Sequence, residues 1–185
     1  DCQALNGAMY GLVKGLCHMS KEQVELFGIL DGYTGLIEGK YKKMKTQEFE
    51  DILNVGGTIL GSSRQPFKFI QEPDDKGRNK VKSMVDNYKK MQLDCLVVLG
   101  GNGSHKTANL LSENGLNIIT LPKTIDNDIY GTDMTFGYAS AIDIAAKYID
   151  DIRTTARSHK RIFVVEIMGH KVGHICLSAG IAAGA

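Results

Sequence analysis

The sequence Leu96-Val97-Val98-Leu99-Gly100-Gly101-Asn102-Gly103-Ser104 joins an apolar run directly to a glycine-rich turn and is the most informative segment for the fold. Its apolar residues predict a buried strand over residues 94–99, and the glycine-rich turn leads directly into a helix predicted over 104–114. The glycines permit close approach of the backbone, and Ser104 is suited to cap a helix whose amino end favours anions. Two interpretations stay open for these residues alone: a phosphate-binding loop, or a glycine-rich turn needed for packing.

A second segment with unusual chemistry follows the next apolar run. Leu116-Asn117-Ile118-Ile119-Thr120-Leu121 predicts a strand, and beyond Pro122 comes Thr124-Ile125-Asp126-Asn127-Asp128. Open α/β sheets bind ligands at the carboxyl ends of their strands, so we expect an active site here, with a phosphate site facing a base. The alternative is a hydrogen-bonded turn, which is the commoner use of such residues.

Helix and strand patterns alternate along the rest of the chain. Helices are predicted over residues 6–17, 46–53, 79–91, 139–156 and 178–185, and further strands over 23–30 and 161–167. This alternation favours an α/β fold, a three-layer Rossmann-like domain whose parallel sheet is covered by helices on both faces. No strand precedes the first helix and none follows the last, so we expect a fragment of a longer protein.

Composition and charge exclude several classes of protein. The 185 residues carry a formal net charge of +1, which offers no basic field for nucleic acid. No apolar run approaches the roughly 20 residues of a membrane span. Cys2, Cys17, Cys95 and Cys176 lack the spacing of a zinc site and are expected to be free thiols in a reducing compartment. We therefore expect a soluble, cytoplasmic protein without nucleic-acid or membrane partners.

Five segments, in their order and spacing, resemble the 6-phosphofructokinase family. They are Gly-Gly-Asn-Gly-Ser (100–104), Pro-Lys-Thr-Ile-Asp-Asn-Asp (122–128), Gly-Thr-Asp (131–133), Ser-His-Lys-Arg (158–161) and Val-Glu-Ile-Met-Gly (165–169). Residues 56–64 are similar to the family's earlier glycine-rich segment. The resemblance covers essentially the whole chain, and five segments together are far more specific than any one of them.

The resemblance implies both an architecture and a reaction. Residues 1–138 would form the donor-binding α/β domain without its first strand, and 139–185 the beginning of a truncated sugar-phosphate-binding domain. The reaction is transfer of the γ-phosphoryl group of ATP to the 1-hydroxyl of fructose 6-phosphate, giving fructose 1,6-bisphosphate in glycolysis. Mg²⁺ is the implied cofactor. The isolated chain, lacking part of the sugar-phosphate pocket, is expected to be inactive.

The resemblance also assigns roles to individual residues. Asp126 takes the position of the base, Thr124 would position the transferring phosphoryl group, and Asp128 would help to hold the metal. The remaining residues contact the substrates: the donor meets Arg64, Gly101, Asn102, Gly103 and Ser104, and the sugar phosphate meets Thr124, Asp126, Arg161, Met168, Gly169 and His170. Arg161 matches a residue that reaches a neighbouring subunit's site, so a homo-oligomer, a dimer or a tetramer, is implied.

Four positions depart from the usual pattern of the family. Asn102 replaces an aspartate and offers Mg²⁺ an oxygen without a charge, so metal binding would depend more on Asp128. His170 replaces an arginine, so a permanent cation gives way to an imidazole, which weakens the implied contact with the phosphoryl group or the sugar. Tyr10 and Lys14 replace two arginines that bind effectors in bacterial allosteric relatives, which leaves regulation of that type open.

The identity of the phosphoryl donor depends on two positions. Gly103 is the small residue of ATP users, whereas Lys123 is typical of pyrophosphate users. We expect ATP, because a blocked pocket excludes a donor more firmly than one cation redirects it. The alternatives are a pyrophosphate-dependent enzyme and a non-catalytic nucleotide-binding homologue. Asn102 and His170 favour the latter, and the retained Asp126 argues against it.

Overall fold

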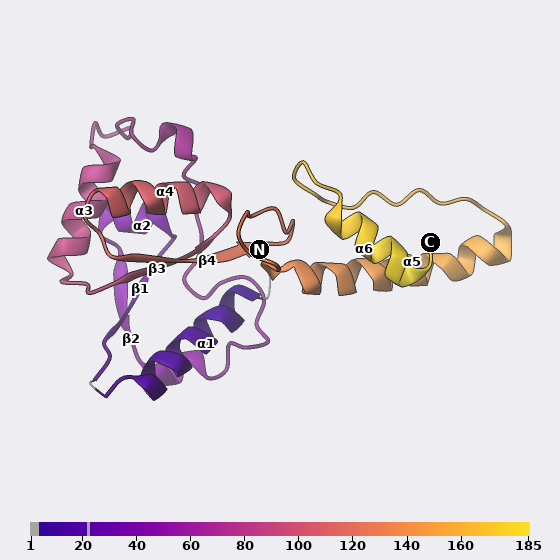
Figure 1. The fold of residues 1–185 in the computed structure, drawn as a ribbon, viewed down its shortest axis with the longest axis horizontal. Coiled ribbons are helices and arrows are strands. Elements are labelled where there is room, and N and C mark those ends of the chain that lie inside the picture. Colours follow the sequence, from indigo (N-terminus) through magenta and orange to yellow (C-terminus); the bar gives the residue numbers. More distant parts are fainter. Residues whose placement is uncertain (1–3, 22) are drawn as a thin grey trace. The chain divides into compact units, whose positions relative to one another are not determined.

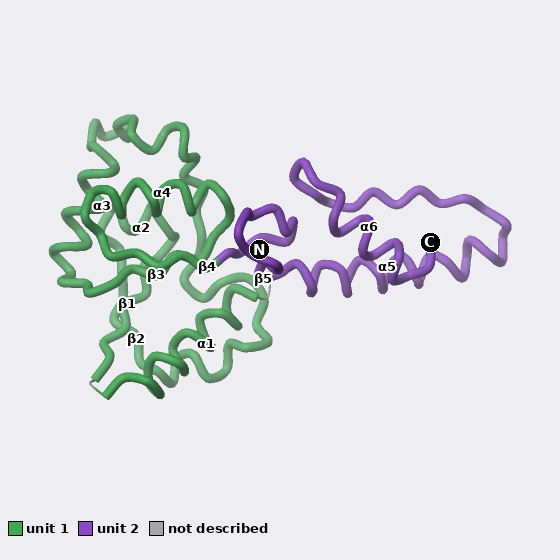
Figure 2. The backbone as a smooth tube through the Cα atoms, viewed as in Figure 1, with its two compact units in different colours: residues 1, 3–121 green, residues 2, 122–185 purple. Residues whose placement is uncertain are grey.

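The structure is a computed structural model that describes residues 4–21 and 23–185. These residues form two compact units, with residues up to Leu121 in unit 1 and Pro122–Ala185 in unit 2 (Figure 2). Helices and strands alternate along the chain in Figure 1, so the α/β character predicted from the sequence is confirmed. Cys2 lies outside the described residues, while Cys17, Cys95 and Cys176 are free thiols as expected.

Residues 96–104 form a strand, a tight turn and the start of a helix. Strand β3 is Leu96–Gly100, helix α4 is Asn102–Glu113, and strand β4 is Ile118–Thr124. Strands β3 and β4 are neighbours in one sheet and are joined through α4, the kind of crossover that a parallel pair requires. The three predicted elements are therefore confirmed, with α4 beginning two residues earlier than the sequence suggested.

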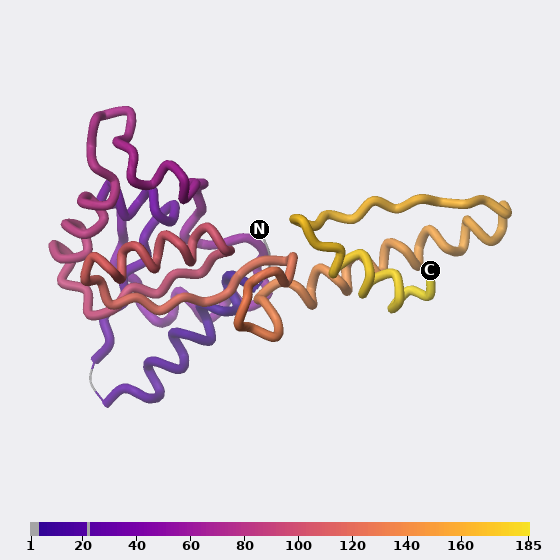
Figure 3. The backbone as a smooth tube through the Cα atoms, turned by 45° about the horizontal axis from the view of Figure 1, so that its top comes forward, coloured from indigo at the N-terminus to yellow at the C-terminus, as the bar shows by residue number. Residues whose placement is uncertain are grey.

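Helices cover both sides of the strands in unit 1. Figures 1 and 3 show α4 on one side of β3 and β4, and α1, Ala4–Met19, on the other. The buried face of α1 carries an apolar residue every fourth position, Leu5, Met9 and Val13, which places all three on one side of the helix. The layered arrangement expected from the alternating pattern is therefore present in this unit.

Two clusters of buried apolar side chains stabilise unit 1. The larger one includes residues of α2, Tyr33–Glu38, α3, Lys80–Lys90, and the β3–α4 region, among them Leu36, Ile70, Met84, Leu96 and Leu111. The smaller one joins α1 to the strand β2, Tyr41–Met44, and to the 3₁₀ helix η1, Thr46–Phe49, through Met9, Val13, Met44, Phe49 and Ile52. A shorter 3₁₀ helix, η2, spans Phe67–Phe69.

The region after α1 differs from the prediction. Strand β1, Leu26–Ile29, lies within the predicted range, but it pairs with β2 in an antiparallel manner that the sequence pattern did not indicate. Between the two strands, α2 spans only six residues, too few for a helical period to be recognised. The helix predicted over 46–53 is wrong in extent, because only the 3₁₀ helix η1 forms there.

Unit 2 consists of a short strand pairing and two helices. Lys123 and Thr124 of β4 pair in parallel with β5, Phe136–Gly137. Helix α5, Tyr138–His159, confirms the predicted long helix, and α6, His174–Ala183, includes the start of the predicted final helix. The two helices are joined by the Arg153 guanidinium, which donates to the Ala183 carbonyl at 2.6 Å.

The strand predicted over residues 161–167 is wrong. In the described part of the chain this segment pairs with no strand, and Figure 1 draws it as an irregular trace between α5 and α6. Its side chains still alternate, with Ile162 96% and Val164 94% exposed but Phe163 44%. A strand needs a hydrogen-bonded neighbour as well as an apolar pattern, and only the pattern can be read from the sequence.

None of the helices among the described residues combines the length and the apolar character needed to cross a membrane.

Candidate active site

The glycine-rich turn at the end of β3 leads directly into the first turn of α4. Gly101 precedes the helix with an extended backbone and caps it without a side-chain hydrogen bond. The capping role predicted for Ser104 is therefore wrong, because Ser104 lies inside the first turn. Its side chain packs instead on Gly100, where an added Cβ would lie 2.4 Å from the Ser104 Oγ atom. Only glycine fits at position 100.

The first amides of α4 are suited to bind an anion. The first helical hydrogen bond runs from the His105 N–H to the Gly101 carbonyl at 3.1 Å. The amides of Asn102, Gly103 and Ser104 precede it, so helix geometry gives them no acceptor within the helix. Asn102 and Gly103 are exposed. Free amides at the positive end of a helix favour phosphate groups.

Arg64 is placed in the same unit as this turn. It is exposed and lies in a segment without helix or strand, between Leu60 and Pro66. Within residues 4–21 and 23–185 its guanidinium forms no ion pair, so its charge is not neutralised by a neighbouring carboxylate. A guanidinium in this state can donate to two phosphate oxygens at once.

The segment after β4 holds Asp126 by both carboxylate oxygens. The Thr124 hydroxyl accepts from the Asp126 N–H at 3.1 Å and donates to its Oδ2 at 3.3 Å. From a turn 44 residues further along the chain, the His170 N–H donates to Asp126 Oδ1 at 3.0 Å. The carboxylate is thus fixed in orientation while remaining partly exposed.

Asn127 forms the hydrogen bonds of the turn that the sequence offered as the alternative interpretation. Its backbone is left-handed, with φ of 51°, a conformation that asparagine tolerates better than most residues. Its side chain accepts from the Thr135 N–H at 2.9 Å and donates to the Asp133 carbonyl at 3.3 Å. The local hydrogen bonds close residues 124–135 into one loop that carries both Asp126 and Asp128.

His170 lies beside the second carboxylate of this loop. Its Nδ1 atom is 3.6 Å from Asp128 Oδ2, and the two form an ion pair when the imidazole is protonated. The imidazole is 70% exposed, whereas the Asp128 side chain is 18% exposed. The sequence alone did not reveal that the His170 backbone holds Asp126. No periodic signal links two segments so far apart in the chain.

The other predicted site residues of unit 2 have fewer contacts with the loop that carries Asp126. Met168 is 77% exposed. Gly169 begins the turn that carries His170, and a Cβ added at Gly169 would lie 2.4 Å from the Val172 carbonyl oxygen. Arg161 is exposed just after the end of α5. In the described part of the chain, no hydrogen bond links its guanidinium to the loop 124–135. Lys123 lies at the end of β4 and is half-buried.

The residues expected to hold Mg²⁺ suit one mode of binding. Among the described residues, no three His, Cys, Asp or Glu side chains gather into a metal cage. Mg²⁺ often keeps several water molecules and binds one or two carboxylates together with substrate phosphates. Asp128 in unit 2 and the exposed amide of Asn102 in unit 1 offer oxygen ligands of this kind. Each of these side chains, taken by itself, can offer an oxygen to an ion that also binds phosphate.

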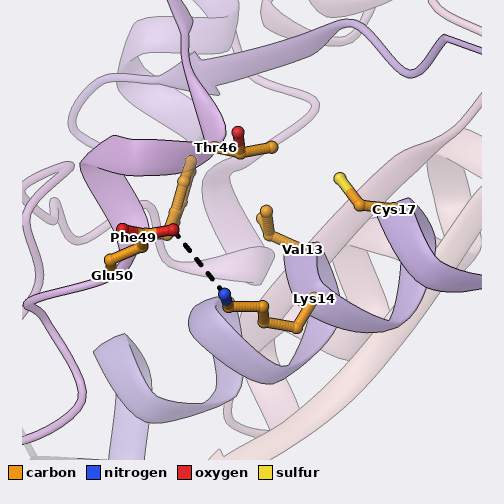
Figure 4. A pocket seen from close by; sticks show the side chains of 6 residues that line it. All are labelled: Val13, Lys14, Cys17, Thr46, Phe49 and Glu50. Carbon is orange, nitrogen blue, oxygen red and sulfur yellow. Dashed lines mark ion pairs between the residues drawn. The ribbon is translucent and has the colours of Figure 1, made fainter.

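A shallow cavity of about 190 Å³ lies between α1 and η1 (Figure 4). Lys14 lines it, with its ammonium nitrogen 3.7 Å from a Glu50 carboxylate oxygen and 5.5 Å from the centre of the Tyr10 ring. Tyr10 and Lys14 are the two positions at which the resemblance to the family implies that arginines are replaced. Because Glu50 already neutralises Lys14, an anionic effector would meet a carboxylate here.

Comparison with known proteins extends over the whole chain. Residues 1–185 match the family model described as Phosphofructokinase. An ATP-dependent 6-phosphofructokinase of Spirochaeta thermophila is 52% identical over 189 residues, covering 100% of this chain and 50% of that protein. One from Propionibacterium freudenreichii subsp. shermanii is 46% identical over 185 residues, covering 100% and 49%. The chain spans about half the length of the curated relatives it matches.

Solved structures agree with these relatives. Phosphofructokinase from Saccharomyces cerevisiae superimposes with a TM-score of 0.87 at 33% identity, over 100% of this chain and 27% of that one. A pyrophosphate-dependent phosphofructokinase from Marinobacter aquaeolei, 18% identical, shares the fold with a TM-score of 0.80 over 98% and 46%. The predicted fold class is confirmed, and the chain belongs to the phosphofructokinase family.

Proposed function

We propose that the full-length protein carrying this chain is an ATP-dependent 6-phosphofructokinase. The observation that carries the proposal is the Asp126 carboxylate, held at both oxygens just beyond the end of β4. The first turn of α4, with its free amides, supplies the second component, a place for phosphate. The 52% identical relative named as an ATP-dependent 6-phosphofructokinase supports the same activity.

Asp126 would accept the proton of the attacking hydroxyl. The 1-hydroxyl of fructose 6-phosphate becomes a better nucleophile as its proton moves to the carboxylate, an effect that typically contributes about 10² to 10⁴ in rate. Thr124 and the His170 N–H fix the carboxylate so that little reorganisation is needed during transfer. The proton is transferred to Asp126 as the bond between the hydroxyl oxygen and the γ-phosphorus forms, while the bond from that phosphorus to the β–γ bridging oxygen breaks and ADP leaves.

The donor phosphates would be held mainly by charge and by backbone amides. Phosphoryl transfer depends largely on positioning and on stabilising charge, so the free amides of α4 and the Arg64 guanidinium have a direct role. Mg²⁺, when bound, would neutralise part of the phosphate charge. Asn102 and Asp128 are the residues that would hold it or its waters.

The proposal also covers the binding of the sugar phosphate and the assembly of subunits. Arg161, Met168, Gly169 and His170 would contact fructose 6-phosphate, with Arg161 reaching the site of a neighbouring subunit in a homo-oligomer. The protein would work in the cytoplasm, where glycolysis takes place. The residues of unit 2 that support this assignment are the turn 168–172 and its contact with Asp126.

Pyrophosphate is the alternative donor, and Lys123 is the residue that favours it. Steady-state rates of the full-length protein with ATP and with pyrophosphate, measured through fructose 1,6-bisphosphate formation, distinguish the two. We expect a larger kcat/KM for ATP, because Gly103 leaves open space where an added Cβ meets no atom within 4 Å. A larger kcat/KM for pyrophosphate would overturn the choice of donor, and turnover with neither would indicate a non-catalytic homologue.

A further inference from the structure

The turn between β1 and α2 contacts the segment that carries Arg64. The Asp31 N–H donates to the Leu60 carbonyl at 2.8 Å, and the Ser63 hydroxyl donates to the Asp31 carbonyl at 2.5 Å. Three residues along, the Thr34 hydroxyl accepts from the Gln65 side-chain amide at 3.0 Å. The three hydrogen bonds involve residues that precede and follow Arg64 in the sequence. They restrict the backbone from which its guanidinium extends.

The same turn also contacts the first turn of α4. The Tyr33 hydroxyl donates to the Ser104 carbonyl at 2.8 Å, across 71 residues of sequence. Burial raises the pKa of Tyr33 well above its usual value, so its hydroxyl stays protonated and keeps donating. Ser104 follows Asn102 and Gly103, whose amides have no acceptor within the helix. The bond therefore fixes the part of α4 that is suited to bind phosphate.

The backbone of the turn is itself unusual. Asp31 and Gly32 both have a positive φ, of 54° and 57°. Such a conformation at a residue other than glycine carries a conformational cost and persists only where surrounding contacts hold it. Gly61 lies against this strained residue, where a Cβ would be 2.4 Å from the Asp31 Oδ1 atom. Gly61 itself has a φ of 72°, a conformation that favours glycine at this position.

We propose that residues 31–34 form a brace that positions the two donor-binding elements, the Arg64 segment and the first turn of α4, relative to each other. The brace residues are positioning residues, since they act through Arg64 and through the α4 amides. The inference rests on the proposed function, in which those elements bind the phosphates of the donor. The brace would set the affinity for the donor and leave the sugar phosphate unaffected.

Three variants of the full-length protein test the brace. Thr34→Val removes the acceptor of the Gln65 amide while keeping the shape of the side chain, and Thr34→Ser restores it. Tyr33→Phe removes the bond to Ser104. We expect the Kd for ATP, measured by calorimetry, to rise about 3- to 10-fold in Thr34→Val and Tyr33→Phe, the range of one lost hydrogen bond. Thr34→Ser should match the wild type.

A matched control separates positioning from general destabilisation. Tyr88 on α3 is also buried, at 8% exposed, and belongs to the same apolar cluster against which Tyr33 packs. We expect Tyr88→Phe to leave the Kd for ATP unchanged. In the active enzyme, Thr34→Val should raise the KM for ATP and leave kcat and the KM for fructose 6-phosphate within about twofold.

A double variant shows whether Thr34 acts through Arg64. In an Arg64→Ala background we expect Thr34→Val to cause no further loss of ATP affinity, whereas Tyr33→Phe should still cause one. Equal losses of ATP affinity from Thr34→Val in both backgrounds would overturn the brace. So would a loss from Tyr88→Phe as large as that from Tyr33→Phe.

Calorimetry needs no turnover, so ATP binding with the expected pattern but no sugar phosphorylation would overturn the proposed function alone. No binding of ATP or pyrophosphate would overturn both.

Discussion

Asp126→Asn should lower kcat of the full-length protein by about 10² to 10⁴ and leave the KM for the donor nearly unchanged. Asparagine has the same shape, and its amide oxygen can still accept from the His170 N–H. What it loses is the ability to accept the proton of the attacking hydroxyl at neutral pH. Steady-state kinetics with saturating fructose 6-phosphate would measure the loss.

The control for this variant is a carboxylate away from the loop. Asp143 is exposed on α5, and we expect Asp143→Asn to retain kcat within about twofold, the usual result for a surface substitution. A wild-type kcat in Asp126→Asn would show that another group acts as the base. A rise in the donor KM with unchanged kcat would instead assign Asp126 to binding.

Gly103→Asp should raise the KM for ATP at least about tenfold and the KM for pyrophosphate much less, because the new carboxylate would obstruct and repel the α-phosphate of the nucleotide, which pyrophosphate lacks. The free protein has room for the side chain, because a Cβ on Gly103 meets no atom within 4 Å. An aspartate in the first turn of α4 also suits the helix dipole, so we expect folding to be unaffected. The loss would therefore come from contact with the nucleotide.

Gly103→Asn serves as the matched variant, with a side chain of the same size but without charge. The difference between its KM for ATP and that of Gly103→Asp gives the electrostatic part of the effect, and thermal unfolding of both proteins checks their stability. Equal increases in KM for ATP and for pyrophosphate would contradict the idea that Gly103 selects the donor.

The parts of the fold that could be predicted are those determined by neighbouring residues. The apolar run of β3 is followed at once by glycines and a helical pattern, so strand, turn and helix are all indicated locally. Helix α3 begins close to where the sequence predicts, because the Asn79 side chain accepts from the Lys82 N–H as an N-cap. Its apolar residues then recur with the period of a buried helical face.

Other features depend on partners that the local sequence does not specify. Residues 161–167 have the composition of a strand but no strand neighbour in the described part of the chain. The pairing of β1 with β2 depends on a turn through the short helix α2. The role of Ser104 was misjudged because a helix boundary two residues earlier changes which residue is the N-cap.

The candidate site shows the same division. The local spacing brought Thr124, Asp126 and Asp128 into one loop, and the structure shows the hydrogen bonds that shape it. The contact of Asp126 with the His170 backbone could not be predicted, since it joins residues 44 positions apart through a main-chain N–H that any residue but proline supplies. The hydroxyl contacts of Tyr33 with Ser104 and of Thr34 with Gln65 are equally unpredictable, because they join residues 71 and 31 positions apart.

The decisive experiment follows the γ-phosphoryl group of ATP to the sugar. The full-length protein would be incubated with fructose 6-phosphate and ATP that is radiolabelled in the γ-phosphate, and the products separated and identified. We expect the label in fructose 1,6-bisphosphate, in the phosphate bonded to the oxygen of carbon 1. We also expect Asp126→Asn nearly to abolish this transfer. Label found only in ATP or in inorganic phosphate would contradict it, and would identify the protein as a nucleotide-binding homologue or a hydrolase.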